Sequence, residues 1–321
     1  MARDPRLRPW LDAHGEATRI CSLLPSATEI AFALGLGDRL VGVTHECDFP
    51  DAARQLPVVT LSTLGDGVRD SRDIHRHIAT SLHEGSSIYL LDHDVLARVD
   101  PDLILTQELC DVCAVSYELV AQAVHRLEGQ RRVVSLEPTS LAGILATIEQ
   151  VGDAAGASDR AAGLLTELRR RIAALADRGR AGGARPRVLA IEWLDPLFTA
   201  GHWVPEMVRL AGGQDPVAVE GHPSAQISWP RVVECAPDIV VLMPCGFTLE
   251  QTAKEARQVR FVEEWARRSP GAAPKVYAVN GSAYFNRPGP RIADGLEILV
   301  EIVQPSSSRA RWEGIAWRRL A

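Results

Sequence analysis

Residues 157–183 read ASDRAAGLLTELRRRIAALADRGRAGG and divide the chain into two halves. Leucine and isoleucine recur here at the spacing of one helix face, Ser158 is a suitable N-cap, and Gly182-Gly183 ends the pattern. A helix of about 20 residues is a rod of about 30 Å, because each residue adds about 1.5 Å. The segment therefore predicts one long, stiff helix that joins two lobes and permits closure of small amplitude.

Short apolar runs alternate with helical patterns on both sides of this helix, which is the signature of β-α-β units and parallel sheets. Ser26 is expected to cap the first helix, with Glu29 completing a capping box. The predicted strands are 19–24, 40–44, 102–106, 132–136, 187–192, 238–243 and 275–279. The other predicted helices are 26–33, 141–151, 204–210 and 291–303.

The two halves also repeat each other in order. LGLGDRLVGV (34–43) corresponds to AGGQDPVAV (211–219), and VDPDLILTQELC (99–110) corresponds to CAPDIVVLMPCG (235–246). The predicted fold class is therefore α/β, with two Rossmann-like lobes that each hold a parallel sheet and are joined by the backbone helix. The expected parts are an N-terminal extension (1–18), an N-terminal α/β lobe (19–156), the connecting helix (157–180), a C-terminal α/β lobe (185–304) and a tail (305–321). The tail is expected either to pack on a lobe or to meet a partner.

Composition excludes several classes of protein. The net charge of -6 disfavours nucleic-acid binding, because phosphate binding needs a basic surface. No apolar run is long enough to span a membrane. The first 19 residues lack the apolar core of a secretory signal, so the protein is expected to be cytoplasmic as written, or periplasmic if the start site is misassigned. Six cysteines in such a chain indicate buried or ligand-facing thiols rather than disulfides.

Four segments carry a family resemblance. They are RICSLLPSATEIAFALGLGDRLVGVTHECDFP (19–50), DPDLILTQ (100–107), DPLFTAGHWVPEMVRLAGG (195–213) and YFNRPGPRIADGLEILVEIV (284–303). On these segments the chain resembles the helical-backbone class of ABC-transporter substrate-binding proteins, and within it the vitamin B12-binding branch. The resemblance implies two lobes with a ligand between them, and a cobalamin or related corrinoid as that ligand.

The candidate binding residues follow the predicted strands, because ligands of open parallel sheets bind beyond the carboxyl ends of the strands. Aromatic residues gather at these ends, and aromatic walls with a few polar groups suit a large, flat corrin ring. The alternative for each aromatic side chain is packing in a lobe core. The candidates are Pro25, Ser26, His45, Glu46, Cys47, Gln107, Glu108, Trp193, Phe198, His202, Trp203, Cys245, Tyr284, Phe285 and Arg287.

Cysteine and histidine raise a second possibility, a metal site. Cys110 and Cys113 form a C-x-x-C pair, and His45 and Cys47 lie on the neighbouring predicted loop. These four side chains are candidate ligands of the corrinoid metal or of a separate ion, and the alternative is that they are small buried residues. His75, His77, His83 and His93 are instead expected to be solvated residues of a helical insertion.

The resemblance also predicts a partner, an ABC-transporter permease. Relatives of this kind dock through one acidic residue in each lobe, and the corresponding positions here are Asp94 and Pro230. Proline cannot form the ion pair, so Glu234, one turn later, is the candidate substitute.

Three functions stay open from the sequence alone. The first is a corrinoid-binding carrier, scavenger or transport component. The second is a binder of another chelate or metal, such as haem, a ferric siderophore or zinc. The third, and least favoured, is a cysteine-dependent redox enzyme. No catalytic motif is found, so the chain is expected not to be an enzyme.

Overall fold

The computed structural model describes residues 19–62, 70–83, 89–107, 131–183, 185–269, 271, 273–305 and 310–321. The chain forms two compact units, each with a central sheet of its own. The first comprises residues 1–67, 78–138 and 143–167, and the second comprises 68–77, 139–142 and 168–321. The domain boundaries expected from the sequence stay predictions.

The first unit is built on a four-stranded parallel sheet in the order β2-β1-β5-β6. Strands β1 and β5 form its core, since both are buried along their whole length. A small antiparallel pair, β3-β4, lies outside this sheet. The strands are β1 (Ile20–Ser22), β2 (Leu40–Gly42), β3 (Thr60–Ser62), β4 (Tyr89–Leu91), β5 (Leu103–Thr106) and β6 (Arg132–Ser135). The helices are α2 (Pro25–Ala33), α4 (His93–Val99) and most of α6 (Leu141–Ala154), with short 3-10 turns η2 (Gly37–Arg39) and η3 (Asp51–Gln55).

The predicted capping box at the first helix is wrong. Helix α2 begins at Pro25, its N-cap is Leu24, and no side chain caps it. Proline suits the first helical position because its fixed φ matches the helix and its missing N–H is not needed there. Ser26 and Glu29 therefore lie inside the helix, where both are buried.

The second unit holds a five-stranded sheet in the order β11-β10-β9-β7-β8. The three central strands are parallel, and both edge strands are antiparallel to their neighbours. The strands are β7 (Val188–Leu194), β8 (Leu197–Thr199), β9 (Ile239–Leu242), β10 (Lys275–Val279) and β11 (Trp317–Arg319). The helices are α8 (Val204–Leu210), α9 (Trp229–Glu234), α10 (Leu249–Gln258), α11 (Phe261–Arg268), α12 (Gly281–Tyr284) and α13 (Ile292–Val303), with residues 71–77 of α3 (Ser71–His83).

The tail packs on the lobe, which decides between the two alternatives open at the sequence level. Strand β11 pairs with β10, and its Trp317 ring packs edge-on against Tyr277 at 5.6 Å. The buried Glu301 carboxylate accepts the backbone N–H groups of Arg311 at 2.8 Å and Trp312 at 3.0 Å, and the Trp317 indole N–H at 2.9 Å. One carboxylate on α13 therefore holds three donors of the tail.

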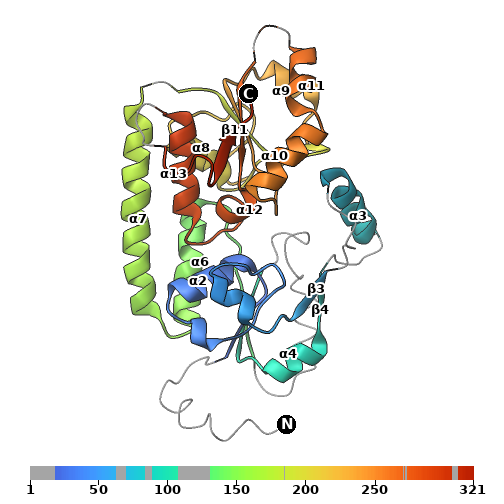
Figure 1. Cartoon of the computed structure of the whole chain (residues 1–321). Coiled ribbons are helices and arrows are strands. Elements are labelled where there is room, and N and C mark those ends of the chain that lie inside the picture. The colour runs from blue at the N-terminus through green and yellow to red at the C-terminus, as the bar shows by residue number, and fades with distance from the viewer. Residues whose placement is uncertain are drawn as a thin grey trace, which may run out of the picture. The chain divides into compact units, whose positions relative to one another are not determined.

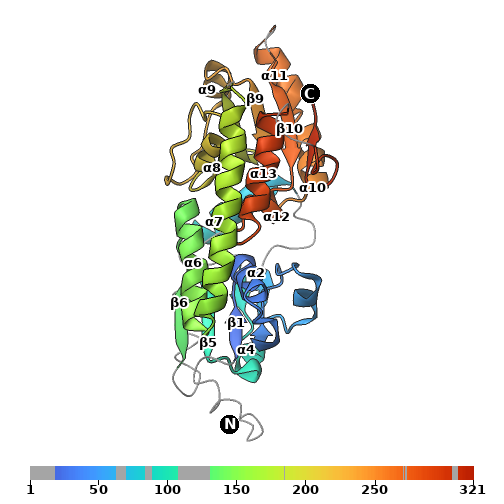
Figure 2. The same ribbon diagram turned by 90° about the vertical axis from the view of Figure 1, so that its left-hand side faces the viewer.

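The long helix α7 (Ser158–Ala181) has 24 residues, and Ser158 is its first residue and not the N-cap that the sequence predicted, since the Ser158 hydroxyl donates to Asp153 at 2.7 Å. Its residues are shared between the two units, with the division after Glu167. In the second unit α7 lies beside α13 (Figures 1 and 2), and Arg171 bonds Asp294 and Glu297 of α13 at 2.6 Å each. The fold class predicted from the sequence is confirmed by the two Rossmann-like sheets.

Candidate functional site

The carboxyl ends of the central strands of the second unit meet at one edge of its sheet. The N–H of Cys245, after β9, donates to the carbonyl of Glu192 in β7 at 3.1 Å, and the N–H of Ser282, after β10, donates to the carbonyl of Phe247 at 3.0 Å. Gly281 permits this approach, because a Cβ there would lie 2.5 Å from the carbonyl oxygen of Pro244. The segments that follow three strands thus form one surface.

Aromatic side chains stand on this surface. Trp193 of β7 and Phe198 of β8 are directly opposed in the antiparallel register, which places both on one face of the hairpin. Phe247 packs edge-on against Trp193 with ring centroids 5.7 Å apart. Trp193 and Phe198 are half-buried, so part of each ring is accessible, as a binding surface requires. Phe247 was not among the predicted residues, although it follows β9 as the candidates follow their strands.

Other predicted aromatics of the second unit are buried by the protein itself. Phe285 has no exposed surface, and Trp203 is 7% exposed. The Trp203 indole N–H donates to the Phe285 carbonyl at 2.8 Å. Tyr284 is half-buried, with Trp312 at 5.3 Å edge-on and the Arg291 guanidinium 5.6 Å from its ring centre. The rings of Trp203 and Phe285 therefore serve the core in this conformation.

Two ionisable side chains beside this surface, Glu192 and His202, have shifted pKa values. Desolvation raises the pKa of the Glu192 carboxyl, and bonds from the Ser224 side chain and the Gly201 backbone oppose the rise. Burial lowers the pKa of His202, whose ring lies tilted by 32° against that of Trp203 with centroids 5.8 Å apart. Sequence reasoning missed Glu192 because it was assigned as the last residue of the predicted strand 187–192, and the candidates were taken from the residues after each strand. Cys245 and Arg287 are both half-buried.

The first unit places polar side chains after its strands. The His45 ring Nδ1 lies 2.8 Å from the Thr60 hydroxyl, and the buried Cys47 Sγ lies 3.0 Å from the Thr28 hydroxyl. Thr44 is a second hydroxyl neighbour of Cys47, at 3.4 Å. The remaining predicted residues of this unit are Pro25, half-buried, Ser26 and Gln107, both buried, and Glu46, exposed.

Both described cysteines of the first unit, Cys21 and Cys47, are buried. Burial raises the pKa of the Cys21 thiol, and the neighbouring Cys47 raises it further. Cys110, Cys113 and Glu108 lie outside the described residues, so the predicted four-residue metal set has only His45 and Cys47 within them. Within the part of the chain that the structure describes, no group of three or more histidine, cysteine, aspartate or glutamate side chains could hold a metal ion.

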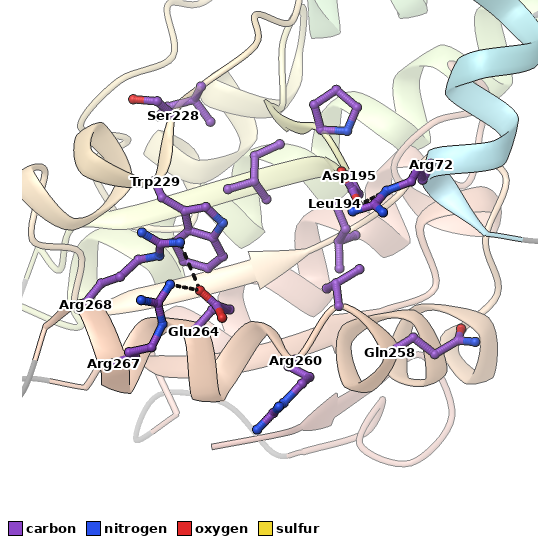
Figure 3. A pocket seen from close by; sticks show the side chains of 14 residues that line it. Arg72, Leu194, Asp195, Ser228, Trp229, Gln258, Arg260, Glu264, Arg267 and Arg268 are labelled. Carbon is purple, nitrogen blue, oxygen red and sulfur yellow. Dashed lines mark hydrogen bonds and ion pairs between the residues drawn. The ribbon is translucent and has the colours of Figure 1, made fainter.

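A pocket of about 580 Å³ opens elsewhere in the second unit, and none of the predicted residues lines it. Its apolar floor includes Leu194 and Leu197, and Trp229 stands in its wall. Three of the four arginines that line it pair with a carboxylate of the lining (Figure 3): Arg72 meets Asp195 at 2.6 Å, and Arg267 and Arg268 meet Glu264 at 2.7 and 3.0 Å.

Comparison with known proteins identifies the family. A family profile described as periplasmic binding protein matches residues 20–281. The chain belongs to this periplasmic binding protein family. The resemblance found in the sequence, to ABC-transporter substrate-binding proteins and their vitamin B12-binding branch, is thereby confirmed. As a member of this family, the chain has the role of a substrate-binding protein.

Two curated relatives match most of the chain. The vitamin B12-binding protein of Yersinia pseudotuberculosis serotype O:3 (strain YPIII) is 25% identical over 279 residues, 86% of this chain and 82% of the relative. An uncharacterized ABC transporter substrate-binding lipoprotein of Bacillus subtilis (strain 168) is 23% identical over 299 residues, 91% of this chain and 82% of the relative.

Solved structures share the fold. The periplasmic vitamin B12 binding protein of Vibrio cholerae superposes with a TM-score of 0.64 at 22% identity, over 91% of this chain and 99% of that one. A periplasmic heme binding protein from Pseudomonas aeruginosa gives a TM-score of 0.69 at 21% identity, over 95% and 98%.

The comparisons bear on location as well. The family is typically periplasmic or anchored outside the cell as a lipoprotein, so the expectation of a cytoplasmic protein is not supported. Among the described residues, the structure shows no helix with the length and apolar character of a membrane span.

Proposed function

We propose that the chain binds a bulky metal chelate, with a cobalamin or related corrinoid as the first candidate, and delivers it to an ABC-transporter permease. The observation that carries the proposal is the half-buried pair Trp193 and Phe198 at the strand ends of the second unit, backed by Phe247. A flat, largely apolar macrocycle gains from packing on such rings, and partly exposed aromatic surface suits this use. Relatives named for vitamin B12 binding support the corrinoid over other chelates.

Haem is the second candidate ligand. Solved structures with this fold include periplasmic heme binding proteins. An aromatic surface can bind either macrocycle, so Trp193 and Phe198 alone do not distinguish a corrinoid from haem as the ligand. A ferric siderophore, zinc and cysteine-dependent redox chemistry stay below both, in the order that the sequence suggested. Among the described cysteines, Cys21, Cys47 and Cys235 are buried and Cys245 is half-buried.

The test is a titration of the purified, metal-free protein with cyanocobalamin, hydroxocobalamin and ferric haem, followed by calorimetry and visible absorbance. We expect micromolar or tighter binding of a corrinoid, a free energy of about -8 kcal/mol or better. Phe198→Ala should weaken binding about tenfold or more, by loss of about 1.4 kcal/mol of ring contact. Ile315→Ala, which changes a side chain that is 65% exposed on the tail, serves as the control. Tighter binding of haem would make haem, and not a corrinoid, the proposed ligand. If none of the three ligands binds, the proposal is overturned.

The permease partner is proposed from the family and from exposed acidic groups. Asp94 is exposed in the first turn of α4. Pro230 lies in the first turn of α9, and Glu234 of the same helix is exposed but bonded to Arg231 at 2.9 Å. Asp94→Asn should reduce uptake of labelled cobalamin in cells while leaving the affinity of the purified protein unchanged. Asp51→Asn, at another exposed aspartate of the same unit, is the matched control.

A further inference from the structure

Residues 70–77 follow β3 in the chain yet belong to the second unit. They form the start of α3, and the Asp70 carboxylate accepts the N–H of Asp73 at 2.8 Å, as a helix cap does. Histidines of this stretch were expected from the sequence to be solvated. The structure instead brings the first turns of α3 onto the body of the second unit beside α10 (Figure 1).

A buried contact holds the first turn of α3. Ser71 has no exposed surface, and Glu255 of α10 is 3% exposed. The Glu255 carboxylate accepts the Ser71 backbone N–H at 3.0 Å and also its hydroxyl. A carboxylate at a helix N-terminus is favoured by the helix dipole, and a buried one that lost these donors would carry a desolvation cost.

Two further contacts fix the same turn on the hairpin that carries the aromatic pair. The Trp193 indole N–H donates to the Ser71 carbonyl at 3.2 Å. The Arg72 guanidinium meets Asp195, in the turn between β7 and β8, at 2.6 and 2.8 Å (Figure 3). The start of α3 is therefore anchored to β7, to the β7–β8 turn and to α10.

His75 is the side chain that this anchoring presents to the aromatic surface. Positions four apart lie on one face of a helix, so His75 shares the face of Ser71. Its ring centroid is 5.9 Å from that of Phe198, and both residues are half-buried. His77, two positions later, is turned about 200° around the helix axis from His75.

We propose that residues 70–77 complete the chelate site of the second unit and that His75 binds the metal of the chelate through a ring nitrogen. The inference rests on the proposed function. A macrocycle packed on Trp193 and Phe198 carries its metal at its centre, with one coordination position directed away from the ring plane. An imidazole nitrogen is among the commonest protein ligands of cobalt and iron. In the exchange, the bond from the metal to a water molecule breaks, the bond to nitrogen forms, the water leaves, and no electron is transferred.

The anchoring supports this role. A ligating side chain contributes most when its position is set before the ligand arrives, because less freedom is lost on binding. The Ser71–Glu255 contact sets the backbone one turn before His75, and Arg72–Asp195 sets the orientation of the helix.

The experiment compares wild type, His75→Ala and His77→Ala in titrations followed by visible absorbance. Hydroxocobalamin and ferric haem carry an exchangeable axial water or hydroxide, whereas the cyanide of cyanocobalamin resists displacement. We expect the visible spectrum of hydroxocobalamin or ferric haem, whichever the protein binds, to shift on binding to wild type and to His77→Ala. His75→Ala should lose this shift and weaken that chelate about tenfold, or 1.4 kcal/mol, while cyanocobalamin binds all three proteins alike.

A second experiment tests the anchor. Glu255→Gln should speed amide exchange of residues 71–77 in the ligand-free protein, and its spectral shift on adding the chelate should be smaller than that of wild type. Glu250→Gln, an exposed carboxylate on the same helix, is the control and should change neither. An equal shift in His75→Ala and wild type would overturn the inference and leave the proposed function standing. Failure of wild type to bind any of the three chelates would overturn the proposed function instead.

Discussion

The two units share a plan of parallel strands with helical crossovers but differ in the side chains that lie beyond the strand ends. In the first unit the ends of β1 and β2 lead to hydroxyl and thiol groups, with Cys47 buried between Thr28 and Thr44. In the second unit, the ends of β7 and β9 lead to Trp193 and Phe247. One topology therefore positions loops of unlike chemistry, so the function depends on the loops and not on the sheet.

The units differ also in how their sheets end. Both edges of the first sheet are parallel strands, whereas the second sheet is bounded by the antiparallel strands β8 and β11. Those two additions bring in Phe198 and the C-terminal tail. The second unit thus has strand pairs and tail contacts that the first unit lacks, and substitutions that remove its buried contacts are expected to have the larger effects.

The largest effect should come from Trp203→Ala. This indole is 7% exposed and donates to the Phe285 carbonyl, so its removal leaves a cavity and an unpaired acceptor. We expect a loss of about 3–5 kcal/mol in the free energy of unfolding, measured by urea denaturation. Phe198→Ala, at a half-buried ring, should cost clearly less. An equal loss of unfolding free energy in the two variants would show that Trp203 and Phe198 do not differ as core and surface residues.

Glu301→Ala should follow. The substitution leaves the N–H groups of Arg311, Trp312 and Trp317 without their buried acceptor, at a cost of about 3 kcal/mol. Urea denaturation measures the cost, and amide exchange should show residues 310–321 released first. Glu313→Ala, at an exposed position of the tail, is the control. A tail that stays protected without Glu301 would show that β11 pairing alone is sufficient.

The third effect is a pH dependence of the second unit. Burial raises the pKa of Asp215 to about 6, against bonds from backbone N–H groups that include those of Val217 and Ala218. Between about pH 4 and pH 6 the folded chain then holds a proton that the unfolded chain has lost, so stability falls as pH rises through this window. The fall should be roughly 3 kcal/mol, and Asp215→Asn should remove it, as measured by denaturation at a series of pH values. A slope that survives in Asp215→Asn would assign it to other groups.

The smallest effect is expected in the first unit, from Cys47→Ser. A serine keeps hydrogen bonds to the hydroxyls of Thr28 and Thr44, so the cost should be about 1 kcal/mol or less. We expect bound metal, measured by elemental analysis, and chelate affinity to be unchanged. Loss of metal in this variant would support the metal-ligand hypothesis for Cys47. Both units would then contribute side chains to ligand binding, the first a thiol and the second its aromatic surface.

Local patterns sufficed for the regular elements. Helix α8 and strand β10 have the predicted bounds, and α7 begins at Ser158, one residue earlier than an N-cap at that position implies. Strands β8 and β11 escaped prediction, because each has three residues and is stabilised by pairing with another strand. The capping box failed for a local reason, since Pro25 moves the helix start one residue upstream of Ser26.

The candidate site, like the fold, was predicted only in part from the sequence. The rule that ligands bind beyond strand ends selected Trp193 and Phe198 from sequence alone, and it equally selected Phe285, whose ring the protein buries completely. Position after a strand does not say whether a ring faces solvent or a neighbouring helix, since that depends on packing. His75 was predicted to be solvated for a related reason, because nothing near it in sequence shows that its helix meets Phe198.

The sequence by itself determined the alternation of strands and helices, the long helix between the halves, the family and the aromatic character of the second set of strand ends, because periodicity and motifs are properties of neighbouring residues. Only the tertiary structure decided that residues 70–77 join the second unit, that the tail closes its sheet through Glu301, and which aromatic rings remain accessible. Each of these depends on a partner far away in the chain, and the free energy of burying a side chain is set by that partner and not by the adjacent sequence.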